Sequence, residues 1–185
     1  MGYYRFGEPR RDLKKLVHIT GQYTVEQVVI SPFDAEREYA PDGRWHWKPL
    51  PRSTSPTGIE VFDAFLRYIS SGHYERRKFY ARYGVPEDWR DDSYNPFPGF
   101  VMVLTGMDIR EFHNRYTLRT ADLLLQYTDL DLKDIARRSG TYDASTLNRL
   151  YRKFHHCTTK QRRLALRKQD DRVGFYRMAD NNFDV

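Results

Sequence analysis

The clearest periodic pattern of apolar residues lies in the C-terminal half of the chain, at spacings of three and four positions. The repeating apolar positions are Ile109, Phe112, Tyr116, Leu123 and Leu124. This spacing puts them on one face of a helix and predicts a long helix from residue 108 to about residue 127. Asp108 is a suitable N-cap, and Glu111 three residues later completes the sequence of a capping box.

Three shorter helices are predicted after this long one. Their ranges are 132–139, 143 or 144 to 153, and 158 or 159 to about 168. Gly140 ends the first of them and permits a tight turn into the second. Residues 170–185 are polar and are predicted to form a mobile tail, from which Phe175 and Tyr176 could dock onto the body.

The N-terminal region gives a different signal. Ser31 fits an N-cap, Pro32 fits the first helical position, and Asp34 would complement the helix dipole. Together they predict a short helix that runs to about residue 39. Residues 40–43 have the chemistry of a turn.

The middle of the chain begins with a linker at residues 50–58, which are rich in Pro and Ser. Helical spacing then predicts a helix over residues 59–69, with Gly72 just beyond its end. A second helix is predicted over residues 75–83, and residues 86–98 are predicted to form a loop. These assignments make the chain mainly α-helical.

Composition and charge narrow the class of protein. The 185 residues carry a formal net charge of +6, which favours a polyanionic partner such as nucleic acid or an anionic membrane surface. A single cysteine, Cys157, excludes an internal disulfide. We expect no signal peptide, because the N-terminus lacks an apolar run, and no membrane span, because no apolar stretch approaches 18 residues. A cytoplasmic location is therefore expected.

Residues 132–154 combine two short helices with a tight turn. The inward positions are Leu132, Ile135 and Ala136 on the first helix, and Leu147, Leu150 and Tyr151 on the second. This is the arrangement of a helix-turn-helix, in which one helix braces the other in the major groove of DNA. An ordinary helical hairpin has the same spacing of apolar residues. The charge of the neighbouring residues is therefore needed to distinguish it from a helix-turn-helix. Residues 146–168 hold eight Lys or Arg and no Asp or Glu, which suits a phosphate backbone.

The segment GMDIREFHNRYTLRTADLLLQYTDLDLKDIARRSGTYDASTLNRLYRKFHHCTTKQRR resembles the AraC/XylS family of bacterial transcription regulators. The resemblance rests on the Ile-Ala pair before Gly140, the Asn-Arg pair at 148–149 and the final basic residue Arg163. It implies an all-α DNA-binding domain with two helix-turn-helix subdomains joined by a long linker helix. On this basis residues 1–57 form an N-terminal extension of unknown role, 58–168 the AraC-like domain and 169–185 a polar tail.

The chain departs from the family pattern at several positions. Thr141, His156, Thr159 and Arg162 stand where the family usually has Phe, Gly, Pro and Tyr. The first subdomain is remodelled by an insertion of about six residues, and prolines 96 and 98 lie where its recognition helix should run. The extension of 57 residues is too short for the usual effector-binding β-barrel, so no small-molecule effector is evident.

These considerations predict a sequence-specific regulator that binds double-stranded DNA. The residues expected to read bases are Ala144, Ser145, Asn148 and Arg149, and those expected to hold phosphates are Arg152, Lys153, Lys160 and Arg163. The same hypothesis includes RNA polymerase and a second copy of the chain as further candidate partners. No catalytic motif is found, so no enzyme is expected, and neither a cofactor nor a metal site is predicted.

Two other functions stay open. The fold could be retained as a protein-interaction module that no longer binds DNA, because the first subdomain is remodelled. Single-stranded nucleic acid could stack on aromatics such as those at residues 45–47, although such aromatics more often cover a small core. His155, His156 and Cys157 are adjacent and do not easily face one metal ion.

Overall fold

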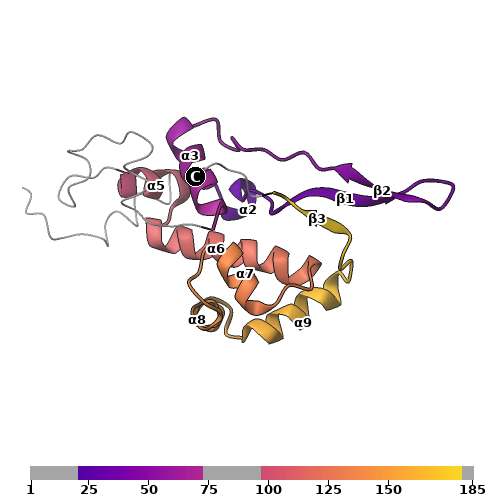
Figure 1. Ribbon diagram of the computed structural model, residues 1–185. Coiled ribbons are helices and arrows are strands. Elements are labelled where there is room, and N and C mark those ends of the chain that lie inside the picture. Colours follow the sequence, from indigo (N-terminus) through magenta and orange to yellow (C-terminus); the bar gives the residue numbers. More distant parts are fainter. Residues whose placement is uncertain (1–20, 73–96, 181–185) are drawn as a thin grey trace, which may run out of the picture.

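A computed structural model describes residues 21–72 and 97–180. Within these residues the chain is mainly helical, with seven helices and a small antiparallel sheet of three strands (Figure 1). Helix α6, Ile109–Tyr127, runs through the middle of the molecule and joins two apolar cores. The Asp108 side chain accepts a hydrogen bond from the Glu111 backbone N–H at 2.8 Å, so the predicted start of this helix is confirmed.

The first core lies against the N-terminal half of α6. It is formed by α2 (Val25–Val28), α3 (Glu60–Ser70) and α5 (Phe97–Thr105). Phe62 and Phe65 of α3 pack on Phe112 with ring centroids 5.7 and 6.3 Å away. The helix predicted over residues 59–69 is therefore confirmed. The buried Tyr116 hydroxyl accepts a hydrogen bond from the Ile30 backbone N–H, which ties this core to the start of the sheet.

The second core lies against the C-terminal half of α6. It is formed by α7 (Leu132–Arg138), α8 (Ala144–His155) and α9 (Thr159–Gln169). All three helices predicted in this region are confirmed to within two residues at each end. Leu124, Leu125, Ile135, Leu147 and Tyr151 are fully buried here. This core therefore fixes the orientation of α8 on the body of the molecule.

The prediction of a helix from residue 31 to residue 39 is wrong. These residues form strand β1, Phe33–Tyr39, which pairs with β2, Trp45–Pro49, in a hairpin. The Ser31 hydroxyl accepts a hydrogen bond from the Phe33 N–H two residues on, which makes a local turn instead of a helix cap. The predicted turn at residues 40–43 is confirmed and closes the hairpin.

Residues 170–180 do not form a mobile tail, and the docking considered for Phe175 and Tyr176 is confirmed. Strand β3, Tyr176–Met178, adds to the other edge of β1, so the strand order is β2-β1-β3. Tyr176 packs on Tyr127 and Phe33 with ring centroids 4.5 and 5.3 Å away. Apolar packing at the base of the sheet thus joins the C-terminal segment to α6 and to β1.

Only part of the first predicted subdomain lies within the described residues. The helix predicted over residues 75–83 and most of the loop at 86–98 lie outside the described residues. The last two residues of the predicted loop, Phe97 and Pro98, instead belong to helix α5 as described, Phe97–Thr105.

Candidate nucleic-acid interface

Helices α7 and α8 are in contact and are joined by a short turn at residues 139–143. Gly140 has φ +87°, a backbone conformation that side chains with a Cβ rarely adopt, and it reverses the chain after α7. Thr141 then fixes the turn, since both its N–H and its hydroxyl donate to the Ala136 carbonyl at 2.9 Å. Asp143 caps α8 by accepting a hydrogen bond from the Thr146 N–H at 2.6 Å.

One face of this unit is buried as the apolar pattern predicts. Ile135 and Ala136 of α7 and Leu147 and Tyr151 of α8 have no exposed surface, while Leu132 and Leu150 are half-buried. The absence of a bulky side chain at Ala136 allows the two helices to approach closely. The apolar stripe therefore fixes which face of α8 points to solvent.

The exposed face of α8 carries four of the predicted site residues. Ser145, Arg149, Arg152 and Lys153 are all exposed. The Arg149 guanidinium donates to the Thr146 hydroxyl at 3.0 Å, and the Lys153 ammonium lies 5.3 Å from the centre of the Phe154 ring. None of the three basic side chains forms an ion pair with another described residue. A polyanion that approaches this face has no ion pair to break; the nearby carboxylate of Asp143 has its pKa lowered mainly by the hydrogen bond from the Thr146 N–H and in part by Arg149.

Asn148 has a different environment from its neighbours. Its side-chain oxygen accepts hydrogen bonds from the N–H and the hydroxyl of Thr159, at 3.1 and 3.3 Å. A proline at position 159 would have no N–H to donate. Recognition of adenine by asparagine uses both its oxygen and its amide nitrogen, and here the oxygen already links α8 to α9.

Arg163, predicted to bind phosphate, is directed into the protein. Its guanidinium donates to the Leu130 carbonyl, in the loop between α6 and α7, at 2.6 Å. Burial lowers the pKa of this guanidinium, and its Nε atom is buried with no partner among the described residues. Lys160, by contrast, is exposed in the first turn of α9.

A polar network that the sequence analysis did not identify holds α8 and α9 on α6. Asp122 is 5% exposed and accepts hydrogen bonds from the Tyr151 hydroxyl and the Arg162 Nε, both at 2.9 Å. Burial raises the pKa of Tyr151, and the bond to Asp122 raises the pKa of Arg162. An aspartate among the buried positions of a helix needs such partners, so the sequence did contain a signal for this network.

A shallow hollow of about 310 Å³ lies where α8 and α9 begin. Its lining residues are Leu132, Ala144, Ser145, Asn148, Thr158, Thr159 and Lys160. The N-terminal ends of α8 and α9 both border it, and each contributes the partial positive charge of a helix start. Ala144, Ser145 and Lys160 are thereby brought together at one place on the surface.

The described residues contain neither a metal-binding cluster nor a membrane-spanning helix. No group of three or more His, Cys, Asp or Glu side chains in these residues could hold a metal ion, and His155–His156–Cys157 do not converge. No helix in the same part of the chain is both long and apolar enough to cross a membrane.

Comparisons with known proteins give one structural likeness. No protein-family model matches the chain, and no curated protein matches it. The solved structure of a xylose-binding transcription activator, xylR, is similar to 69% of this chain at 17% sequence identity, with a TM-score of 0.45. The chain spans about a third of that protein, 34% of its length.

Proposed function

We propose that this chain is a sequence-specific transcription regulator that binds duplex DNA with α8 in the major groove. The observation that carries the proposal is the division of α8 into a buried apolar face and an exposed basic face. Leu147 and Tyr151 lock one face on the second core, while Arg149 and Arg152 extend from the other. A helix fixed in this way by a bracing helix is the reading element of helix-turn-helix proteins.

Ser145 and Arg149 are the base-reading residues in this proposal, with Ala144 in apolar contact at the start of α8. An arginine reads guanine through two parallel hydrogen bonds to O6 and N7. To make such a contact, the Arg149 guanidinium would have to give up its hydrogen bond to the Thr146 hydroxyl. Asn148 supports this surface by holding the start of α9 in position.

The phosphate contacts are assigned to exposed basic side chains near the same helix. Arg152 and Lys153 lie on α8, and Lys160 borders the hollow where α9 begins. Arg163 acts within the fold, through its bond to Leu130, and supports the interface from inside. The concentration of eight basic residues and no acidic ones in residues 146–168 supports a sequence-independent attraction to DNA.

Selection from random duplex DNA tests this proposal. The purified chain is used to enrich bound duplexes, and the consensus is then titrated against the parent and the Arg149→Ala variant. The variant should lose about 1–3 kcal/mol of binding free energy and tolerate any base at one position. Arg44→Ala removes the same charge from the turn of the β1–β2 hairpin and should change the affinity less than twofold, as expected for a distant exposed group. Enrichment of no consensus, or equal binding by Arg149→Ala, would show that α8 does not read DNA.

A further inference from the structure

The β1–β2 hairpin extends away from the helical body, on the other side of the molecule from α8 and α9 (Figure 1). Its aromatic residues therefore do not cover a core: Tyr39 is 54% exposed and Trp45 is 48% exposed. Monomeric proteins seldom leave two neighbouring large aromatic side chains so accessible without a role in binding. This part of the molecule is outside the interface assigned to DNA.

The two faces of the hairpin differ in chemistry. Residues directly opposite in an antiparallel pair share a face, so Arg37 and Trp47 lie together with Tyr39 and Trp45. Phe175 joins them from the segment before β3, 6.4 Å from the Tyr39 ring. We call these five residues the aromatic–arginine face.

The opposite face is charged and internally paired. Glu38 accepts a hydrogen bond from the Lys48 ammonium at 3.0 Å and lies 3.2 Å from the His46 imidazole. These groups satisfy one another at the surface. An incoming partner gains little there, because exposed pairs of this kind are already solvated and compensated.

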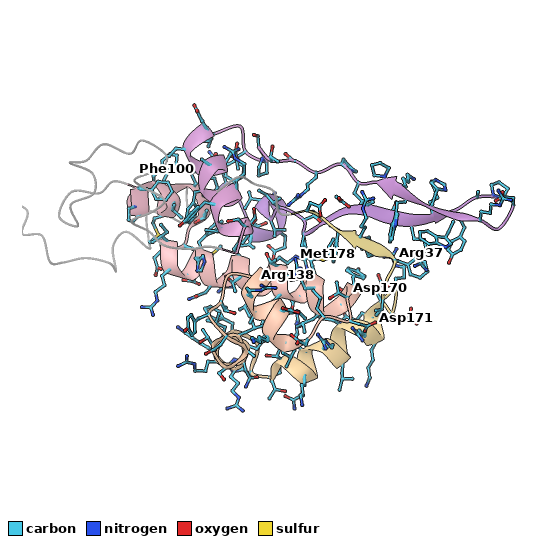
Figure 2. The ribbon with its side chains drawn as sticks, in the orientation of Figure 1. Arg37, Phe100, Arg138, Asp170, Asp171 and Met178 are labelled. Carbon is cyan, nitrogen blue, oxygen red and sulfur yellow. The ribbon has the colours of Figure 1, made fainter. Side chains whose placement is uncertain are left out.

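Arg37 is the centre of the aromatic–arginine face. Its guanidinium carbon lies 4.6 Å from the Trp45 ring centroid, 5.9 Å from that of Trp47 and 5.4 Å from that of Phe175. Figure 2 labels it on the hairpin beside the segment that leads to β3. Its Nε is buried without a hydrogen-bond partner, and it forms no ion pair with another described residue. The aromatic rings thus hold a planar cation in place while leaving its donors without a carboxylate.

The charge of the hairpin distinguishes between kinds of partner. Residues 33–49 hold four Asp or Glu and three Lys or Arg, whereas residues 146–168 hold eight basic residues and no acidic one. A near-neutral element lacks the positive field that draws nucleic acid to a surface. Trp, Tyr and Arg together are instead the residues that dominate the energetics of protein–protein contacts.

We propose that the aromatic–arginine face is a docking surface for a protein segment that presents a carboxylate next to apolar side chains. The carboxylate pairs with the Arg37 guanidinium, and the apolar groups cover Trp45 and Tyr39. Pre-organisation of Arg37 by the rings reduces the side-chain entropy lost on binding. The edge of β2 is a less suitable contact, since Lys48 and Pro49 at its end oppose pairing with another strand. This proposal does not depend on DNA binding.

The test uses a library of random twelve-residue peptides displayed on phage. Peptides are selected on the whole protein and depleted on the Arg37→Gln variant, and the affinity of synthetic copies is then measured by fluorescence anisotropy. The expected result is a consensus with Asp or Glu beside apolar residues, whose affinity falls at least tenfold with Arg37→Gln. Changing the acidic residue of the peptide to its amide should cause the same loss. Lys48→Gln, on the opposite face of the same hairpin, should bind within twofold of the parent.

Further measurements separate a lost contact from a lost hairpin. The melting temperature and the tryptophan Nε1–H resonances of Arg37→Gln should match those of the parent, and Arg37→Lys should recover part of the affinity. Three results would overturn the proposal. The first is a peptide consensus without acidic residues, or the absence of any enrichment that depends on Arg37. The second is binding of a thymidine dodecamer that Arg37→Gln abolishes, and the third is self-association in sedimentation velocity that the same substitution abolishes. The second result would indicate a single-stranded nucleic acid as the occupant, and the third a second copy of the chain.

Discussion

Replacement of Asp122 by alanine should destabilise the protein more than the loss of any exposed ion pair on α9. The Asp122 side chain is 7% exposed and serves two donors, the Tyr151 hydroxyl and the Arg162 guanidinium, whose side chain is 28% exposed. Asp122→Ala leaves both donors without their carboxylate at the junction of α6, α8 and α9.

The magnitude follows from these two losses. Removing one partner of a buried ion pair costs about 3–5 kcal/mol, and the partial exposure of Arg162 places its share near 3 kcal/mol. The Tyr151 hydroxyl keeps only a long contact of 3.5 Å to the Leu118 carbonyl. This adds about 1 kcal/mol, which gives a total of about 4 kcal/mol. In a chain of this size that change lowers the melting temperature by roughly 8–16 °C.

Urea unfolding followed by circular dichroism measures this difference, with Asp129→Ala as the matched control. Asp129 also pairs with an arginine of α9, Arg167, at 3.1 Å, but its side chain is 80% exposed. Arg167 keeps two carbonyl acceptors, at Leu125 and Thr128, so the control should lose less than about 1 kcal/mol. Equal free energies of unfolding for the two variants would refute the reasoning that burial makes the Asp122 network important.

Four other substitutions test separate parts of the structure. Lys160→Ala should weaken binding to all duplexes alike and reduce the salt slope by about one, without changing the melting temperature; a sequence-dependent loss would contradict its assignment to phosphate. Arg163→Ala should instead lower the free energy of unfolding by about 1–3 kcal/mol, because its bond to Leu130 is internal, and a stable variant with reduced DNA affinity would restore the phosphate role. Gly72→Ala should be strongly destabilising in thermal melts, since φ is +79° and the new Cβ would lie 2.8 Å from the Arg137 carbonyl oxygen; an unchanged melting temperature would contradict this packing. Burial lowers the pKa of His113 from 6.5 to about 4, so the unfolded chain binds a proton more readily and stability should fall as the pH drops through this interval. His113→Gln should flatten that pH dependence in urea titrations, and an unaltered profile would assign it to other groups.

Local sequence signals were sufficient for α3 and for the helices from α6 to α9, but not for α2 or α5. The N-cap Asp108, the glycine at 140 and the spacing of the apolar residues all act within a few residues, and the structure has these helices where the signals place them. The inward face of α8 was predicted for the same reason, because Leu147 and Tyr151 recur at helical spacing.

Contacts between residues far apart in the sequence could not be predicted from local signals of this kind. The Ser31-Pro32 start suits a helix and a turn equally, and what selects the strand is pairing with residues 45–49 and 176–178. Asn148 and Arg163 have side chains typical of DNA contacts, yet their partners are Thr159 and Leu130, which come close only when α9 packs against α8 and against the loop before α7. Residue type alone does not distinguish a side chain directed to solvent from one that holds a neighbouring element.

The position of β1 between β2 and β3 has a consequence for the order in which the chain can fold. Arg177 and Asp34 form an ion pair across 143 positions of sequence, and β3 pairs with β1 over nearly the same distance. A ribosome adds about 5–20 residues per second, so β1 waits on the order of ten seconds with one edge unpaired. Such non-local pairing slows folding, so the pairing of β3 with β1 is one of the last events. Conversely, truncation before residue 176 removes Tyr176 from the Tyr127 and Phe33 rings and leaves an open strand edge beside them, which is a template for association with other chains.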